Sequence, residues 1–186
     1  MTPELIARYD RRVPRYTSYP TAPNFSPDVD GETYRRWLGE IAPDTAPSLY
    51  LHIPFCHAMC WYCGCNTKVT RRLEPVASYA NTLIAEIEAT EAALAHRLDI
   101  AHVHFGGGAP NMLAPGDLIR LIAHLRDRFT LDADAVIAIE IDPRSTTDAF
   151  IDACAQAGVT RVSIGVQDLN RDVQKAVNRI QPLALI

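Results

Sequence analysis

The 186-residue chain has no apolar run long enough to cross a membrane, and its first twelve residues, MTPELIARYDRR, lack the apolar core of a signal peptide. Its 18 basic residues are outnumbered by 22 acidic ones, and the net charge of -4 gives no electrostatic footprint for nucleic acid. No Gly-Lys-Ser/Thr triplet follows its glycine run, which excludes a Walker phosphate loop. These absences predict a soluble cytoplasmic protein that binds neither membrane nor nucleic acid.

Cysteine is scarce outside one stretch, because four of the five cysteines lie in residues 50–66, YLHIPFCHAMCWYCGCN. Without a signal peptide, so few cysteines indicate a reducing compartment rather than a disulfide framework. The first three, Cys56, Cys60 and Cys63, have the spacing C-x3-C-x2-C and follow an apolar run that predicts a strand. Three thiolates in so short a loop can converge on one metal centre. Unlike four, they leave one iron of an iron–sulfur cluster open for a small-molecule ligand.

The same stretch allows a structural zinc site formed by Cys56, Cys60, Cys63 and Cys65, because thiolates bind zinc well. Zinc sites usually take their ligands from two C-x2-4-C pairs well apart in the chain, or from cysteines with spaced histidines. The spacing therefore favours the cluster, and a zinc-stabilised interaction module remains the alternative. The fifth cysteine, Cys154, lies on an apolar helix face and is expected to be a buried small hydrophobic residue.

From residue 48 onward, short apolar strands alternate with amphipathic helices. Strands are expected at 49–55, 100–105, 135–141 and 161–166, and helices at about 76–87, 115–129 and 147–157, with a fourth beginning near Arg171. This alternation predicts an α/β fold of parallel (β/α) repeats with right-handed crossovers. Four repeats cannot close an eight-fold barrel, which needs about 250 residues. Residues 48–186 are therefore expected to form part of an incomplete TIM-like barrel, truncated at its C-terminus.

Residues 1–47 form a separate segment that is rich in proline. Because proline fixes φ and removes a hydrogen-bond donor, most of this segment is expected to be extended or turning. It is interpreted as an N-terminal arm, with one short helix at residues 32–41.

Residues able to bind ligands follow each expected strand. The four groups are the cysteines, Gly106-Gly107-Gly108, Glu140 with Asp142, and Gln167 with Asp168. Carboxyl ends of parallel strands share one rim, so one site could collect all four groups. Each group also has a plainer interpretation. The glycines can form a tight turn, Glu140 can be a solvated strand end, and Asp142 before Pro143 can be a turn former.

The pattern C-x3-C-x-aromatic-C resembles the signature of the radical S-adenosylmethionine (SAM) superfamily, with Cys56, Cys60, Tyr62 and Cys63 in the matching places. In that family three cysteines hold a [4Fe–4S] cluster, and SAM chelates the fourth iron. The glycine run after the second strand resembles the family's GGE-type segment, in which backbone groups meet the amino end of SAM.

Six stretches together resemble one family within that superfamily, the oxygen-independent coproporphyrinogen III oxidases. They are VPRYTSYPTA (13–22), LYLHIPFCHAMCWYCGCN (49–66), HFGGGAPNML (104–113), IAIEIDPR (137–144), VSIGVQD (162–168) and VNRIQ (177–181). The related haem chaperones share the three-cysteine loop, so a haem-binding or haem-transfer protein of the same superfamily is the second alternative. The first stretch and Cys65 speak against it, because the haem chaperones generally lack both.

The resemblance implies a role for twelve residues. The cluster is held by Cys56, Cys60 and Cys63, and the SAM on it is contacted by Tyr50, Gly107 and Glu140. A possible second SAM is contacted by Tyr62, Gly108, Ala109, Gln167 and Arg179. Cys65 is an essential residue at the catalytic site that does not bind the cluster. The family usually has threonine where this chain has Ala109. A backbone contact there survives the change, whereas a hydroxyl contact does not.

The resemblance also implies a reaction, in which an electron donor such as a flavodoxin or ferredoxin reduces the cluster. SAM is then cleaved to methionine and a 5′-deoxyadenosyl radical, which removes a hydrogen from a substrate propionate. Loss of CO2 and one electron leaves a vinyl group, so that coproporphyrinogen III becomes protoporphyrinogen IX in anaerobic haem biosynthesis. Arg15 is the expected partner of a substrate carboxylate. The family protein is longer and monomeric, so this chain is expected to be a fragment with impaired activity.

Overall fold

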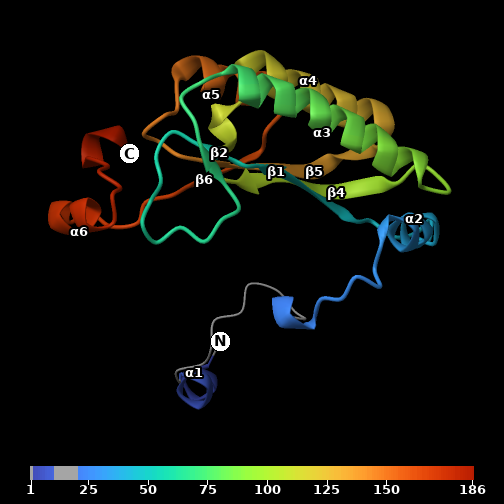
Figure 1. Cartoon of the computed structure of the whole chain (residues 1–186), viewed down its shortest axis with the longest axis horizontal. Helices are drawn as coiled ribbons and strands as arrows, with labels where there is room; N and C mark the ends of the chain where they lie inside the picture. The colour runs from blue at the N-terminus through green and yellow to red at the C-terminus, as the bar shows by residue number, and fades with distance from the viewer. Residues whose placement is uncertain (1, 11–20) are drawn as a thin grey trace. The chain divides into compact units, whose positions relative to one another are not determined.

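The computed structural model of the chain describes residues 2–10 and 21–186 (Figure 1). The chain divides after Tyr34 into two compact units, of which the second, from Arg35 to Ile186, contains all the strands found in the described residues. Within the described ranges, no helix is both long enough and apolar enough to cross a membrane.

The first unit contains a helix that the sequence analysis did not predict, α1 (Pro3–Tyr9). Its cause is local, because the Thr2 hydroxyl accepts a hydrogen bond from the Leu5 N–H at 3.3 Å and Pro3 suits the first turn. A short 3-10 turn, η1 (Ala22–Asn24), follows. Arg15 lies outside the described residues, so its expected role stays a prediction.

The helix α2 (Gly31–Gly39) confirms the short helix expected at residues 32–41. It runs across the division between the two units. Its first turn is capped by Asp30, whose carboxylate accepts a hydrogen bond from the Thr33 N–H at 2.8 Å.

Four parallel strands form the main sheet, in the order β1 (Ser48–Ile53), β4 (Asp99–Gly107), β5 (Thr130–Ile141) and β6 (Arg161–Ile164). They confirm the four expected strands, although β5 begins five residues earlier than the expected start at residue 135. The first expected strand is interrupted at Pro54, which has no N–H for the ladder. After this break β2 (Phe55–Cys56) pairs in parallel with β3 (Lys68–Val69) in a second, two-stranded sheet.

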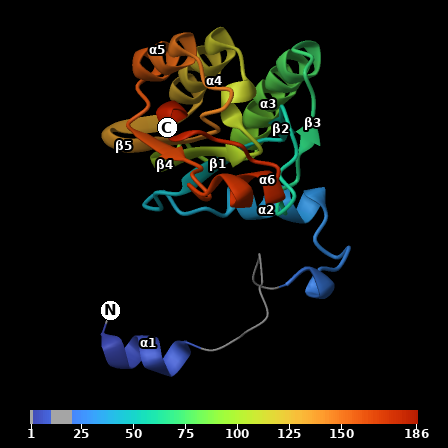
Figure 2. The same cartoon turned by 90° about the vertical axis from the view of Figure 1, so that its left-hand side faces the viewer.

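Helices α3 (Glu74–Ala92), α4 (Pro115–Arg128) and α5 (Asp148–Ala157) lie side by side against one face of the main sheet (Figures 1 and 2). They confirm the three expected crossover helices. Proline occupies the first turn of α3 and of α4, and Gly158 ends α5 with a positive φ of 81°. The short elements η2 (Pro110–Met112), α6 (Arg171–Ala176) and η3 (Leu183–Leu185) complete the chain.

The hydrophobic core lies between this sheet face and the three helices. Alternate residues of the inner strands point into it, as Leu51 and Ile53 do from β1 and Val103 and Phe105 from β4. The α4 residues that meet them are spaced by the helical period: Leu118, Leu121, Ile122 and Leu125. Burial of each such side chain contributes about 1.5–3 kcal/mol. The core therefore holds β1, β4 and β5 together, and the β5–β6 ladder brings the carboxyl end of β6 to the same edge.

Candidate functional site

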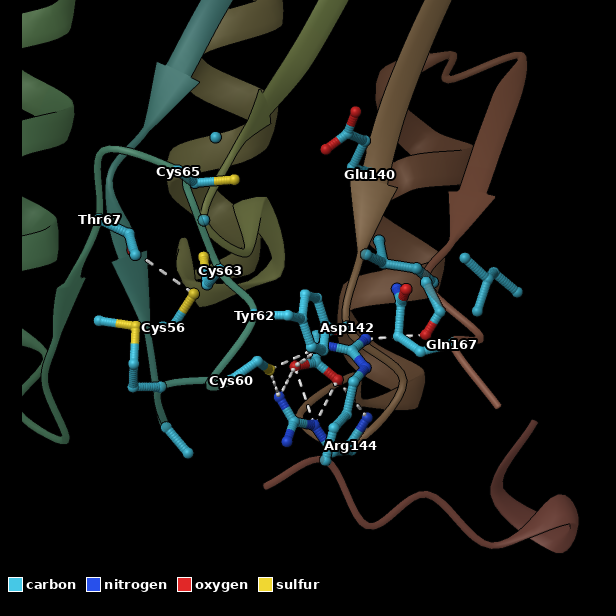
Figure 3. A pocket seen from close by; sticks show the side chains of 18 of the residues that line it. Cys56, Cys60, Tyr62, Cys63, Cys65, Thr67, Glu140, Asp142, Arg144 and Gln167 are labelled. Atoms are coloured by element: carbon cyan, nitrogen blue, oxygen red, sulfur yellow. Dashed lines mark hydrogen bonds and ion pairs between the residues drawn. The ribbon is translucent and has the colours of Figure 1, made fainter. Parts of the chain in front are cut away.

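A cavity of about 270 Å³ lies at the carboxyl edge of the main sheet (Figure 3). Its lining residues come from the loops or ends of all four main strands. Ten of the twelve residues to which the resemblance gives a role line it: Cys56, Cys60, Tyr62, Cys63, Cys65, Gly107, Gly108, Glu140, Gln167 and Arg179. Of the expected site residues, Tyr50 and Ala109 are not among those that line the cavity.

The cysteine loop, residues 56–66, begins at the end of β2 and is anchored by the β2–β3 pair. The Thr70 N–H donates to the Cys56 carbonyl at 2.9 Å, and the Cys63 N–H donates to the Cys60 carbonyl at 3.0 Å. The Thr67 hydroxyl lies 3.5 Å from the Cys56 Sγ. Burial raises the pKa of the Cys56 thiol, and the hydrogen bond from Thr67 opposes this rise.

The three cysteines fit an iron–sulfur cluster better than a single ion. Among residues 2–10 and 21–186, no three or more Cys, His, Asp or Glu side chains are grouped closely enough to hold one metal ion. Instead, the thiols of Cys56, Cys60 and Cys63 line one shared space. That arrangement suits a cluster, because its cysteines bind different iron atoms. All of these thiols are free of disulfides.

Cys65 lies at the same cavity but in a more exposed position than Cys60. Burial, and after it the neighbouring Cys63, raises the pKa of the Cys65 thiol. The next residue of its CGCN motif, Asn66, offers its carbonyl to the His52 Nε2 at 2.7 Å. This contact ties the end of the cysteine loop to strand β1.

Two arginines surround Cys60, and the sequence analysis singled out only one of them. The Arg144 Nη2 and the Arg179 Nη1 each lie 3.5 Å from the Cys60 Sγ. Asp142 binds Arg144 through two carboxylate oxygens, with Nε–Oδ1 at 3.0 Å and Nη2–Oδ2 at 2.6 Å. Its Oδ2 also lies 3.5 Å from the Arg179 Nη1.

This contact network changes the interpretation of Asp142, which is more than a turn former. Burial by itself raises the pKa of the Asp142 carboxyl, but the hydrogen bonds from Arg144 and the two arginine charges outweigh burial and lower it. The same ion pair raises the pKa of Arg144. The sequence did offer a signal for this ion pair, because Asp142 and Arg144 lie two residues apart directly after the end of a predicted strand.

Arg179 connects the cysteine loop with the C-terminal part of the chain. Its buried guanidinium donates to the Gly165 carbonyl at 2.8 Å and to the Gln181 side chain at 3.1 Å, besides its contact with Cys60. Asn178, which has a φ of 53°, donates from its side chain to the Met59 carbonyl at 2.7 Å. Asparagine tolerates this left-handed conformation better than most residues.

Glu140 lines the cavity from the end of β5, and its carboxylate contacts His104, one of three neighbouring aromatic side chains. Its carboxylate lies 3.1 Å from the His104 Nε2, and the Tyr50 ring stacks on His104 with 5.8 Å between centroids. The Tyr50 hydroxyl lies 3.1 Å from the His52 Nδ1. Because a carbonyl only accepts, His52 donates through Nε2 to Asn66, and its neutral form accepts from Tyr50 through Nδ1.

The glycine run lets the end of β4 approach the cysteine loop closely. Gly107 has a φ of +112°, and a Cβ there would lie 2.9 Å from the Ile53 carbonyl oxygen. A Cβ on Gly108 would lie 2.6 Å from the Phe55 carbonyl oxygen and 2.9 Å from the Cys56 Sγ. The next residue, Ala109, is buried, and its N–H already donates to Phe55 at 2.8 Å. The expected ligand contact of Ala109 therefore stays a prediction that this hydrogen bond does not favour.

Tyr62 lines the cavity from the cysteine loop, and Gln167 lines it from the segment after β6 (Figure 3). Burial is the main cause that raises the pKa of Tyr62 to about 12, although the Arg179 charge opposes it. Tyr62 therefore stays protonated at neutral pH and offers a hydroxyl donor and an apolar ring.

Comparisons with known proteins agree with this arrangement. Residues 50–185 match the model of the radical SAM superfamily. Oxygen-independent coproporphyrinogen III oxidases from Bradyrhizobium diazoefficiens and Escherichia coli are 47% and 42% identical to the chain, over 97% and 95% of its length. The solved structure of the Escherichia coli coproporphyrinogen III oxidase, described as a radical SAM enzyme, matches 98% of the chain at 37% identity, with a TM-score of 0.84.

The match covers only part of each relative. The chain spans 40% of the Bradyrhizobium protein, 38% of the Escherichia coli protein and 40% of the solved chain. Within this chain, however, the superfamily match runs through the cysteine loop and all four strands of the main sheet from Tyr50 onward. The parallel α/β fold agrees with that of the solved neighbour. The chain therefore belongs to the radical SAM superfamily.

Proposed function

We propose that this chain is the cluster-binding and SAM-binding part of an oxygen-independent coproporphyrinogen III oxidase. One observation carries the proposal: three cysteine thiols and the polar ends of the other strands line a single cavity. The relatives that match nearly the whole of this chain are named as oxygen-independent coproporphyrinogen III oxidases. The proposed domain organisation is an N-terminal arm, residues 1–47, followed by a partial barrel, residues 48–186.

The proposed cofactor site uses the residues of the cavity. Cys56, Cys60 and Cys63 would hold a [4Fe–4S] cluster, and Glu140 would accept hydrogen bonds from the ribose or the ammonium group of SAM. Gly107, which lines the cavity, would meet SAM through its backbone groups. Tyr50, which does not line the cavity, would contact the same SAM molecule from outside it. When bound, the cluster and SAM supply a carbon-centred radical that can remove a hydrogen from a propionate side chain.

A second SAM is a further part of the proposal, with Tyr62, Gly108 and Gln167 as its contacts. These three residues line the cavity. Arg179 would have to exchange one of its present partners to join them, because its donors already reach Gly165, Gln181 and Cys60. The role proposed for Cys65 is that of a catalytic thiol that lies beside the cluster and does not bind iron.

The proposed substrate is coproporphyrinogen III, with Arg15 as a carboxylate partner, and the proposed electron donor is an acidic carrier such as a flavodoxin or ferredoxin. Between Cys56 and Leu73 the chain carries Lys68, Arg71 and Arg72 and no acidic residue, although its overall net charge is -4. Such a local positive charge suits an acidic protein partner. Because salt screens such an attraction, the rate at which the carrier reduces the cluster should fall as salt is added.

The experiment that tests the proposal is SAM cleavage by the anaerobically reconstituted chain. With dithionite as reductant, the chain should release methionine and 5′-deoxyadenosine, measured by liquid chromatography. Cys60→Ala is the matched control, and it should release neither product. A wild-type chain that carries the cluster and SAM but yields no 5′-deoxyadenosine above this control would overturn the proposed chemistry for the chain.

A further inference from the structure

Cys60 has an electrostatic environment that the other two proposed ligands lack. Two guanidinium groups, those of Arg144 and Arg179, each place a nitrogen 3.5 Å from its Sγ. Cys56 has only the neutral Thr67 hydroxyl at the same distance. The Cys63 thiol has the thiol of Cys65 as its neighbour. The positive charge of these contacts is therefore concentrated beside Cys60.

The position of Arg144 is fixed by contacts on both sides. Asp142 holds its guanidinium through bonds of 3.0 Å and 2.6 Å. Asp142 is in turn held by the buried Asn111, whose side chain accepts from the Asp142 N–H at 2.9 Å and donates to the Asp142 carbonyl at 3.1 Å. A bidentate ion pair on such a support fixes the direction of the guanidinium, whose Nη2 also points to Cys60.

The charges in this network do not cancel. Asp142 contributes one negative charge against the two positive charges of Arg144 and Arg179, which leaves one positive charge beside Cys60. The three side chains are only 10–19% exposed, so water screens this charge weakly. Hydrogen bonds to cluster sulfurs and nearby charge are among the terms that set the reduction potential of an iron–sulfur cluster. Positive charge favours the reduced state, which carries one more electron.

We infer that Arg144 is a positioning residue that, held by Asp142, donates to the Cys60 thiolate and raises the reduction potential of the cluster. The inference rests on the proposed function, because it concerns a cluster bound by Cys60. It adds a role for two residues, Asp142 and Arg144, that do not contact the reacting groups. The plainer interpretation is that their ion pair only shapes the loop after β5. The two interpretations differ in what they predict for the potential.

The test is a redox titration of the reconstituted chain without SAM, followed by EPR of the reduced cluster. Arg144→Gln removes a positive charge and the N–H donor to sulfur. It should lower the equilibrium constant for reduction about tenfold, which is about 59 mV for one electron. Asp142→Asn removes a negative charge and should shift the potential in the opposite direction. Arg120→Gln is the matched control, because Arg120 is a half-exposed arginine paired with Asp117 on α4, away from the cavity, and its potential should equal that of the wild type.

Shifts of opposite sign from the two partners of one ion pair support the inference, because a purely structural pair has no reason to produce them. If Asp142→Asn does not fold, Arg144→Lys serves as the second variant. Lysine keeps the positive charge, so the equilibrium constant for reduction in this variant should stay within about threefold of that of the wild type. Equal potentials in wild type and Arg144→Gln, with full cluster content, overturn the inference. A wild-type chain that forms no reducible cluster overturns the proposed function instead, so the two failures are distinguishable.

Discussion

The same four strands serve two different regions of this protein. On the face covered by α3, α4 and α5, the strands β1, β4 and β5 present apolar side chains such as Phe105 and Ile139, which are fully buried. At their carboxyl edge they end in thiols, carboxylates and arginines that line an open cavity. The first region holds strands in register, and the second uses the ends that this register aligns. Substitutions in the first should therefore change the free energy of unfolding, and substitutions in the second should change cluster binding.

The largest effect is expected from Cys60→Ala at the carboxyl edge. Loss of one of three ligands should reduce the iron and sulfide content of the reconstituted chain almost to zero. Cys154→Ala is the matched control, because Cys154 is buried in the helical layer and contacts the core instead of the cavity. Iron analysis and the absorbance of the cluster would separate the two variants. Normal cluster content in Cys60→Ala would contradict the assignment of the ligands.

Leu121→Ala should produce the largest effect in the other region. Leu121 is fully buried in α4, and truncation of such a leucine costs about 2–5 kcal/mol of folding free energy. Cluster content per folded molecule should not change. Urea unfolding measures the loss, with Ile151→Ala as control, since Ile151 is 43% exposed on α5 and its removal should cost less than about 0.5 kcal/mol. A similar loss in both variants would contradict the position of the core.

Gly108→Ala tests the boundary between the two regions. The added methyl group would lie 2.6 Å from the Phe55 carbonyl oxygen and 2.9 Å from the Cys56 sulfur. We expect a loss of about 1–3 kcal/mol in stability together with reduced cluster content, because the loop must shift to make room. Gly116→Ala provides the comparison, since no atom lies within 4 Å of its added methyl group and alanine favours the helix. Equal behaviour of the two variants would show that the close approach at Gly108 is unimportant.

The smallest effect is a dependence of stability on pH that arises from Asp142. Its pKa is lowered from 3.8 in the folded chain, where Arg144 outweighs the effect of burial. Its contribution is therefore fully present above about pH 5 and is lost as pH falls through the lowered pKa. Asp142→Asn should be less stable than the wild type at neutral pH, with the difference shrinking toward pH 3. Urea unfolding of both chains across this range measures it, and a difference independent of pH would contradict the ion pair.

The sequence was sufficient to predict the helix-covered region because its signals are local. Periods of two and of 3.6 residues gave all four main strands and the three crossover helices. The departures also have local causes, since Pro54 interrupts the first strand and Thr2 caps a helix in a segment expected to be mostly extended. Residue patterns were thus informative wherever a few neighbouring positions decide the structure.

The carboxyl edge was predicted only in part, because its contacts join residues far apart in the chain. The cysteine spacing and the family resemblance identified most of the residues that line the cavity. They did not reveal that Arg144 contacts a cysteine 84 positions earlier, or that Asn178 holds Met59 across 119 positions. The ligand contact that the resemblance implies for Ala109 stays a prediction, and the bond from its buried N–H to Phe55 was not visible in the sequence either. Such contacts depend on how the loops pack after the sheet has formed.

The most direct test of the central claim is anaerobic reconstitution of the chain with iron and sulfide, followed by EPR of the reduced protein with and without SAM. The account predicts a [4Fe–4S] signal that changes when SAM is added, because three cysteines leave one iron open to a small-molecule ligand. Retention of zinc in place of a cluster would contradict it. So would a cluster with a signal indifferent to SAM, because the cavity beside the three thiols would then not be the SAM site.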